Sequence, residues 1–143
     1  MGDWTVRVAV RTRKGIIMTK NVGQDKWHLL GGKKEAVDRD WRCTAVREAF
    51  EEAQLCLPRE RLARHETSHN KRGKKGRYSL HYCSIDLPVL CVKGIPTKGP
   101  EDEEIRVFSY KELRRMLQAN EVGPRDTGYL RRRKLLRKPH ART

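Results

Sequence analysis

The chain has 143 residues, of which 36% are hydrophobic and 36% are charged, and its formal net charge at pH 7 is +15. This length suits one domain with a modest core, so we expect a single domain over residues 1–143. No apolar run reaches the roughly eighteen residues that a membrane-spanning helix needs, and the excess of cations indicates a polyanionic partner.

The spacing of the four cysteines bears on whether metal or disulfide cross-links stabilise the protein. Cys43, Cys56, Cys83 and Cys91 show no C-x-x-C spacing, which argues against a zinc site and against a disulfide framework. We expect them to be small buried side chains of a protein in a reducing compartment, the cytoplasm or the nucleus.

The first part of the chain predicts three strands and a helix. Residues 4–10 alternate between apolar and polar side chains, which is typical of a half-buried strand. Short strands are expected over 16–20 and 26–30, the latter ending at the pair Gly31-Gly32. A helix is expected over 40–53.

The second part adds strands and helices in a mixed order. The expected elements are strands over 62–67 and 78–85, an open choice between loop and short strand over 89–92, a strand over 105–110, and helices over 111–120 and 126–138. This mixture around a long central helix predicts an α/β sandwich.

Positive charge is concentrated in two stretches. Residues 125–143 hold eight Lys or Arg and one Asp, a net charge of +7, and residues 59–77 hold eight Lys or Arg and two Glu, a net charge of +6. Solubility alone explains such clusters poorly. Because both lie outside the apolar-periodic segments, we expect them to contact a polyanion, and a basic helix and tail are expected from about residue 125.

The central helix carries a cluster of carboxylates. At 100° per residue, Glu48, Glu51 and Glu52 share an arc of about a hundred degrees. The apolar residues expected to pack against the rest of the protein lie on the other side: Val46, Ala49, Phe50 and Ala53. On this assignment, truncating Phe50 to Ala would cost about 3–5 kcal/mol. Oxygen ligands suit Mg²⁺, so the cluster indicates a metal site; the alternative is a solvated acidic face.

The same segment resembles a known family motif. The sequence REAFEEAQL, residues 47–55, resembles the core of the Nudix box, G-x5-E-x7-R-E-U-x-E-E-x-G-U, where U is aliphatic. KWHLLGGKKE resembles the W-x-x-P-G-G-x-x-E segment that precedes the box, and EDEEIRVFSYKELRRML resembles the acidic loop, strand and helix that follow it. The sequence departs from the pattern at Leu30 (proline in the family), at Asp38 (glutamate, one residue closer to the arginine) and at Gln54 (glycine).

The resemblance implies an α/β/α sandwich with a mixed sheet and a Mg²⁺-dependent pyrophosphohydrolase, with Mn²⁺ as the alternative ion. It implies metal binding by Glu48, Glu51 and Glu52, with Gly32 allowing close approach of the backbone, and orientation of the glutamates by Arg47. Glu52 is the expected general base. Two residues of the later acidic loop are the second choice, Glu103 and Glu104.

The expected substrate is highly anionic. The basic loop and two further residues are the candidate substrate contacts: Lys71, Arg72, Lys74, Lys75, Arg77, Lys33 and, for stacking on a base, Trp41. Together with VREAFEEA and TGYLRRRKL, this loop resembles the diphosphoinositol polyphosphate phosphohydrolases. A diphosphoinositol polyphosphate or a nucleoside polyphosphate is therefore expected. The alternatives are an mRNA cap or RNA 5′ end, and a non-catalytic scaffold that binds RNA or protein.

One further motif is set aside. HETSH, residues 65–69, matches the H-E-x-x-H pattern of zinc proteases, which requires a helix. The surrounding residues favour a strand, in which residues four apart are separated by about 13 Å and cannot share a zinc ion.

Overall fold

The computed structural model describes residues 3–70 and 78–140. Within them the strands are β1 (Asp3–Arg11), β2 (Ile16–Lys20), β3 (His28–Lys33), β4 (Ala63–Asn70), β5 (Tyr78–Asp86) and β6 (Glu104–Phe108). The helices are α1 (Trp41–Ala53), α2 (Tyr110–Gln118) and α3 (Pro124–Arg132), with short 3₁₀ turns η1 (Arg59–Arg61) and η2 (Val92–Gly94). None of these helices has the length and apolar character needed to cross a membrane.

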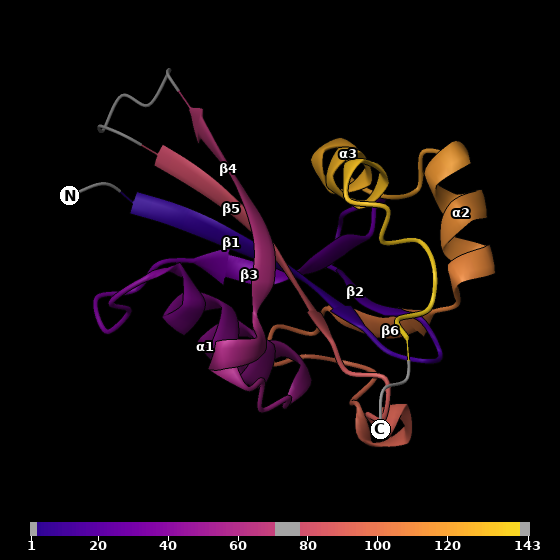
Figure 1. Ribbon diagram of the computed structural model, residues 1–143, viewed down its shortest axis with the longest axis horizontal. Coiled ribbons are helices and arrows are strands. Elements are labelled where there is room, and N and C mark those ends of the chain that lie inside the picture. Colours follow the sequence, from indigo (N-terminus) through magenta and orange to yellow (C-terminus); the bar gives the residue numbers. More distant parts are fainter. Residues whose placement is uncertain (1–2, 71–77, 141–143) are drawn as a thin grey trace.

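The strands form one mixed sheet in the order β4-β5-β1-β3-β2-β6. The pair β1–β5 is parallel, whereas the other neighbouring pairs are antiparallel. Helix α1 covers one face of the sheet, and α2 and α3 lie on the other side (Figure 1). The expected α/β sandwich with a mixed sheet is therefore confirmed.

Strand β1 shows how the alternating pattern makes two cores. Val6, Val8 and Val10 are fully buried in the cluster beneath α1, with Ala45, Ala49 and Ala53 of the helix. Ala9 belongs to the second cluster, which α2 and α3 cover. Strand residues of one parity share a face, so Arg7 lies on the α3 side of the sheet.

Residues 89–92, for which loop and short strand were both open, form no strand among the described residues; they lead through a turn into η2. Two local expectations were wrong. Helix α3 ends at Arg132 instead of continuing to residue 138, because Lys134 adopts a left-handed conformation with φ 56°. Of the cysteines, all free, only Cys83 is buried; Cys56 and Cys91 are exposed.

Helix α1 also packs through only part of the set of residues expected. Its buried residues are small, Thr44, Ala45, Ala49 and Ala53, while the side chain of Phe50 is exposed, at 56%. Because small residues recur every four positions, the helix can approach the sheet closely along that stripe, and no space remains there for an aromatic ring. The assignment of Phe50 to the core was therefore wrong.

Candidate active site

A glycine pair at the end of β3 allows α1 to lie directly against the sheet. A Cβ at Gly31 would lie 1.8 Å from the carbonyl oxygen of Val6, and a Cβ at Gly32 would lie 2.5 Å from the carboxylate of Glu48. Any larger residue would push either the neighbouring strand or the glutamate away. The pair therefore makes room for the carboxylates of α1.

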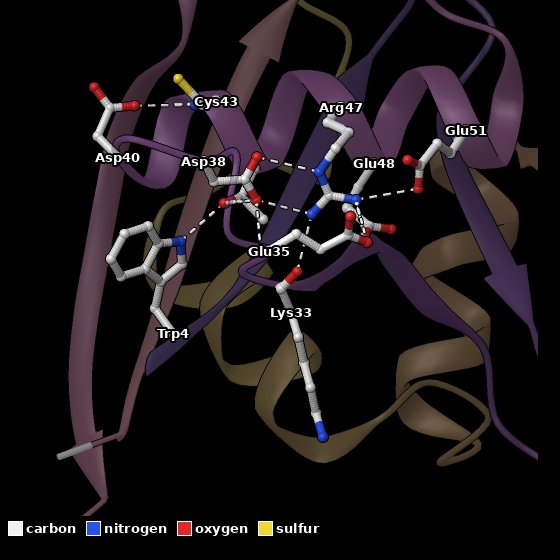
Figure 2. Close-up of polar contacts among 10 residues, drawn as sticks. Trp4, Lys33, Glu35, Asp38, Asp40, Cys43, Arg47, Glu48 and Glu51 are labelled. Carbon is white, nitrogen blue, oxygen red and sulfur yellow. Dashed lines mark hydrogen bonds and ion pairs between the residues drawn. The ribbon is translucent and has the colours of Figure 1, made fainter. Parts of the chain in front are cut away.

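Arg47 gathers the surrounding acids around its guanidinium group (Figure 2). Its Nη1 donates to Glu35, Glu48 and Glu51 at 3.0–3.1 Å. Its Nη2 donates to the carbonyl oxygen of Lys33 at 3.0 Å. Asp38 raises the pKa of Arg47 above its usual value, so this cation stays charged. The predicted role of Arg47 in orienting glutamates fits these contacts.

Asp38 supports Arg47 from the loop that precedes α1. It accepts hydrogen bonds from Arg47 Nε at 3.1 Å and Nη2 at 2.8 Å, and also from the hydroxyl of Thr44 and the backbone N–H of Glu35. Burial acts to raise its pKa, but these donors, Arg47 foremost, lower it below the ordinary value. The altered spacing noted in the sequence thus still brings a carboxylate to Arg47.

The helix end tolerates the other departure from the motif. Gln54 occupies the left-handed cap position, with φ 56° and ψ 35°, and its N–H donates to the carbonyl oxygen of Phe50. A side chain in this conformation costs about 1 kcal/mol relative to glycine. The cap geometry is kept despite that cost.

Three carboxylates lie close enough to share a cation. Oxygen atoms of Glu35, Glu48 and Glu51 all lie within 4.8 Å of one another. Burial raises the pKa of Glu48, although Arg47 opposes this. Hard divalent cations favour such oxygen donors, so the residues present fit an ion of the Mg²⁺ type. Glu35 was not among the predicted metal ligands. It could have been found from its position three residues after the glycine pair, where the W-x-x-P-G-G-x-x-E segment has its glutamate.

Glu52 faces the sheet rather than the solvent. Its Oε1 accepts the backbone N–H of Gly31 at 2.8 Å, while its Oε2 forms no hydrogen bond with a described residue. Burial is the main cause that raises the pKa of Glu52 to about 8, and the negative charges of Glu48 and Glu103 add to it. The metal-free carboxyl group therefore holds a proton more readily than an ordinary glutamate.

The later acidic loop contributes one buried carboxylate. Glu103 is 4% exposed; its Oε2 accepts the N–H of Glu101, and its Oε1 is buried without a partner in the described part of the chain. Glu104, at the start of β6, does not line the cleft. Of the two predicted alternatives for the base, the structure brings only Glu103 to the site.

These carboxylates line a cleft of about 590 Å³. Besides the acids, its walls include Arg7, Thr19, Asn21, Gln24, His28 and Lys33. A second cavity, of about 290 Å³, continues past Arg7 and His28, which line both. The strands β1, β3 and β5 and the start of α3 enclose this second cavity, with Tyr82 and Asp126 in its wall.

The second cavity was missed by the sequence analysis. Asp126 is 2% exposed and accepts hydrogen bonds from the Tyr82 hydroxyl at 2.5 Å and the N–H of Leu29 at 2.9 Å. Asp126 had been included in the basic C-terminal helix as its one acid. The guanidinium group of Arg7, which is half-buried, forms no hydrogen bond or ion pair with a described residue. A lone charge inside an apolar strand was the signal for Arg7.

The predicted substrate contacts are only partly brought together. Lys33 lines the cleft. Trp41 does not: its ring packs on His65, with centroids 4.5 Å apart, and on the guanidinium of Arg42. The basic loop residues Lys71, Arg72, Lys74, Lys75 and Arg77 lie outside the described residues. HETSH lies in strand β4, as expected, which removes the zinc-protease alternative.

Comparison with known proteins identifies the fold family. The NUDIX domain model matches residues 2–132. The NUDIX domain of Shewanella oneidensis NrtR, solved with ADP ribose, superposes with a TM-score of 0.70 at 13% identity, covering 92% of this chain and 87% of that one. A MutT protein from Methanosarcina mazei Go1 gives 0.67 at 13% identity, covering 94% of each chain.

A third solved structure is similar to a comparable extent. The C. elegans Ap4A hydrolase gives a TM-score of 0.62 at 14% identity, covering 92% of this chain and 95% of that one. At such identities the likeness to solved structures concerns the fold alone. No curated protein sequence matches the chain.

Proposed function

We propose that this chain, which belongs to the NUDIX domain family, hydrolyses a pyrophosphate bond in a nucleoside polyphosphate. The enzyme class, a pyrophosphohydrolase acting on phosphoric anhydrides, is supported by the family match and by the fold shared with MutT and Ap4A hydrolase structures. Enzymes of this family use divalent metal ions; Mg²⁺ is the ion we propose, with Mn²⁺ as the alternative.

One observation carries the proposal: a cluster of close carboxylates opens onto a cleft of two connected cavities. Glu35, Glu48 and Glu51 would hold the metal, which polarises phosphoryl oxygens and lowers the pKa of bound water when present. Arg47 keeps the three side chains in place by donating to each of them. One guanidinium group faces all three carboxylates, so a bound cation would balance the negative charge that remains.

Glu52 is the group that we propose as the general base. Gly31 fixes one carboxylate oxygen, which leaves Oε2 to accept a proton from the attacking water. Glu103 is the second candidate, because its buried Oε1 has no partner among the described residues. The two can be distinguished by variants, since Glu52→Gln and Glu103→Gln remove one proton acceptor each.

A nucleoside fits the second cavity better than an inositol ring fits the cleft. Leu80 and Tyr82 supply apolar surface, and His28 and Arg125 supply polar groups, as expected for a base-binding pocket. Arg7, between the two cavities, lies where a phosphate chain would pass. Ap4A and ADP ribose, named with two of the similar structures, are nucleotides of this kind.

A diphosphoinositol polyphosphate finds less support in the described residues. The cleft lining includes six carboxylates but only two full cations, Arg7 and Lys33. A substrate with phosphates on every side of a ring would meet repulsion at most of these positions. An RNA 5′ end is the second candidate, because Arg125, the first residue of the basic C-terminal stretch, lines the second cavity.

A substrate panel tests this function. Nucleoside triphosphates, Ap4A, ADP ribose, capped RNA and a diphosphoinositol polyphosphate should be compared at equal concentration with Mg²⁺, with Mn²⁺ and with EDTA. We expect the highest kcat/KM for a free nucleotide and no turnover in EDTA. A preference for capped RNA would mean that the substrate is the second candidate, an RNA 5′ end, and not a free nucleotide. Equal turnover with EDTA would contradict the metal mechanism.

A further inference from the structure

A third cavity, of about 460 Å³, lies away from the cleft and shares no lining residue with it. Four cations surround it: Arg13, Lys14, Lys93 and Lys138. Its remaining lining is the mostly apolar run of residues 88–92, and no carboxylate belongs to the lining. The cavity therefore combines an apolar floor, residues 88–92, with a rim of positively charged side chains.

Three segments far apart in the sequence meet here. They are the turn between β1 and β2, the segment that follows β5, and the C-terminal segment beyond α3. In Figure 1 the yellow C-terminal segment runs down from α3 toward the salmon segment after β5. Each segment is held by specific contacts, so the cations are placed by the fold rather than by chance proximity.

The turn and the segment after β5 are joined through β1. Thr12 closes the turn by accepting the N–H groups of Lys14 and Gly15 at its hydroxyl, and Tyr110 donates to the Thr12 carbonyl oxygen at 2.7 Å. The N–H of Leu87 donates to the Arg11 carbonyl oxygen at 2.8 Å. These contacts fix Arg13 and Lys14 opposite residues 88–92.

The C-terminal segment is fastened by two arginines. Arg11 donates to the carbonyl oxygen of Arg137 and Arg114 to that of Leu136, both at 2.8 Å, and Arg11 also pairs with Asp86 at 3.4 Å. Buried Leu135 anchors the same segment in the core. These contacts hold the backbone next to Lys138 in place. They do not involve the Lys138 side chain, so its positive charge is not neutralised.

None of the four rim cations forms an ion pair with a described residue, and each is exposed. Four like charges around one cavity repel one another unless an anion lies between them. Surface lysines usually avoid this by spreading over the molecule. The arrangement suits the binding of an anion.

We propose that this cavity binds a nucleotide, with its phosphates on the rim cations and its base on the apolar floor, as a second site separate from the active-site cleft. Its volume lies in the range of small-molecule pockets, which are mainly apolar with a few placed polar groups. Val89, 87% exposed, is available to such a flat apolar body. Inorganic polyphosphate would use the cations but leave the floor uncovered.

The test is an NMR titration of the full chain in EDTA with ATP, tripolyphosphate and a short single-stranded RNA as probes. We expect ATP to shift the backbone amides of Leu90, Val92 and Lys93, in addition to any shifts at Gly31 and Gly32 in the cleft. The fourfold variant Arg13→Gln, Lys14→Gln, Lys93→Gln, Lys138→Gln should weaken ATP binding at this site at least about tenfold.

A matched control removes the same net charge elsewhere. Arg39, Lys111, Arg131 and Lys134 are exposed, line none of the three cavities and form no ion pair with a described residue. Changing all four to Gln should leave the affinity of the third cavity within about twofold. The exposed position of Val89 permits Val89→Asp, which should abolish binding without affecting the fold.

Four results would overturn the proposal. The control variant could lose as much affinity as the rim variant, which would reduce the effect to net charge. ATP could shift only cleft amides. Tripolyphosphate could bind as tightly as ATP, which would leave the floor without a role. RNA could be the only probe that shifts these amides, which would make the surface a nucleic-acid contact instead.

Discussion

The two sides of helix α1 differ in which properties of the protein a substitution would change. The inner side, with Glu48, Ala49 and Glu52, packs against β1 and β3 and also supplies carboxylates to the cleft. The outer side, with Phe50, faces the solvent. Packing and chemistry therefore share one side of the helix, and the other side is free of both.

This arrangement has an energetic consequence. A carboxylate that faces a sheet loses hydration, which is why Glu52 has a raised pKa whereas its exposed neighbour Glu51 is only paired with Arg47. The charged form of Glu52 is therefore unfavourable on the inner side unless a cation is bound, and without one the carboxyl group takes up a proton. Substitutions on the inner side should change both stability and activity, and in opposite directions for Glu52.

The largest effect is expected for Glu52→Gln. Losing the proposed base should lower kcat by about 10²–10⁴-fold with Mg²⁺. The same change removes a carboxyl group that must take up a proton to be buried beside Glu48 and Glu103, and Gln can still accept from Gly31. In EDTA, we expect the melting temperature to rise by about 4 °C or more.

Glu60→Gln is a suitable comparison, because this exposed side chain lies outside the cleft. It should change neither kcat nor the melting temperature. If Glu52→Gln kept its activity while Glu103→Gln lost it, the base would be Glu103. A fall in the EDTA melting temperature of Glu52→Gln would contradict the account of Glu52 as an unfavourably buried carboxyl group.

Asp38→Ala should come next. The substitution leaves Arg47, Thr44 and the N–H of Glu35 without their shared acceptor and should cost about 2–4 kcal/mol at pH 7. Because the pKa of Asp38 is lowered in the folded protein, its contribution is complete above the unfolded value near 3.8 and disappears as pH falls through the folded pKa.

Urea denaturation at several pH values measures this dependence. The gap in unfolding free energy between wild type and Asp38→Ala should be constant from pH 7 to about pH 5 and shrink below pH 3.8. Asp102→Asn, at an exposed pair with Lys98 and a left-handed backbone (φ 64°) that Asn also adopts, should stay within about 0.5 kcal/mol throughout. A gap that widened at low pH would have the wrong sign for a carboxylate stabilised by Arg47.

A smaller effect is expected for Ala49→Leu on the inner side. Ala49 is fully buried against β1 and β3, so added methylene groups should cost about 1–3 kcal/mol. The larger side chain would also move α1 away from the glycine pair, so kcat should fall although no catalytic group is altered. Normal activity together with normal stability would mean that the helix does not approach the sheet as closely as the structure shows.

Most of the fold could be predicted from local patterns in the sequence. The alternation in β1, the acidic helix and the glycine pair identified the sheet, α1 and the position of the carboxylates. The orientation of α1 could not be predicted in the same way, because Phe50 is more hydrophobic than Ala45 or Ala49. Close packing against the valines of β1 selected the small residues instead, and that contact exists only in three dimensions.

The same limit applies to Arg7 and Asp126. Each is a single charge in a segment with another dominant character, an apolar strand for Arg7 and a basic helix for Asp126. Their importance arises from the second cavity, which β1, β5 and α3 form together. Residues 71–77, by contrast, were prominent in the sequence and lie outside the described residues, so their expected contact with substrate stays a prediction.

The smallest effect is expected for Phe50→Ala, on the outer side of α1. Since 56% of the residue is exposed, truncation removes little buried surface, and the free energy of unfolding should change by no more than about 0.5 kcal/mol. Leu30→Ala is the matched control: Leu30 is fully buried beneath the same helix, and its truncation should cost about 2–5 kcal/mol. Both variants should be measured by urea denaturation at low and high protein concentration. A loss above about 2 kcal/mol for Phe50→Ala that appeared only at high concentration would mean that a second copy covers the ring. The same loss at every concentration would mean that Phe50 packs inside the monomer, and the two sides of α1 would then have to be exchanged.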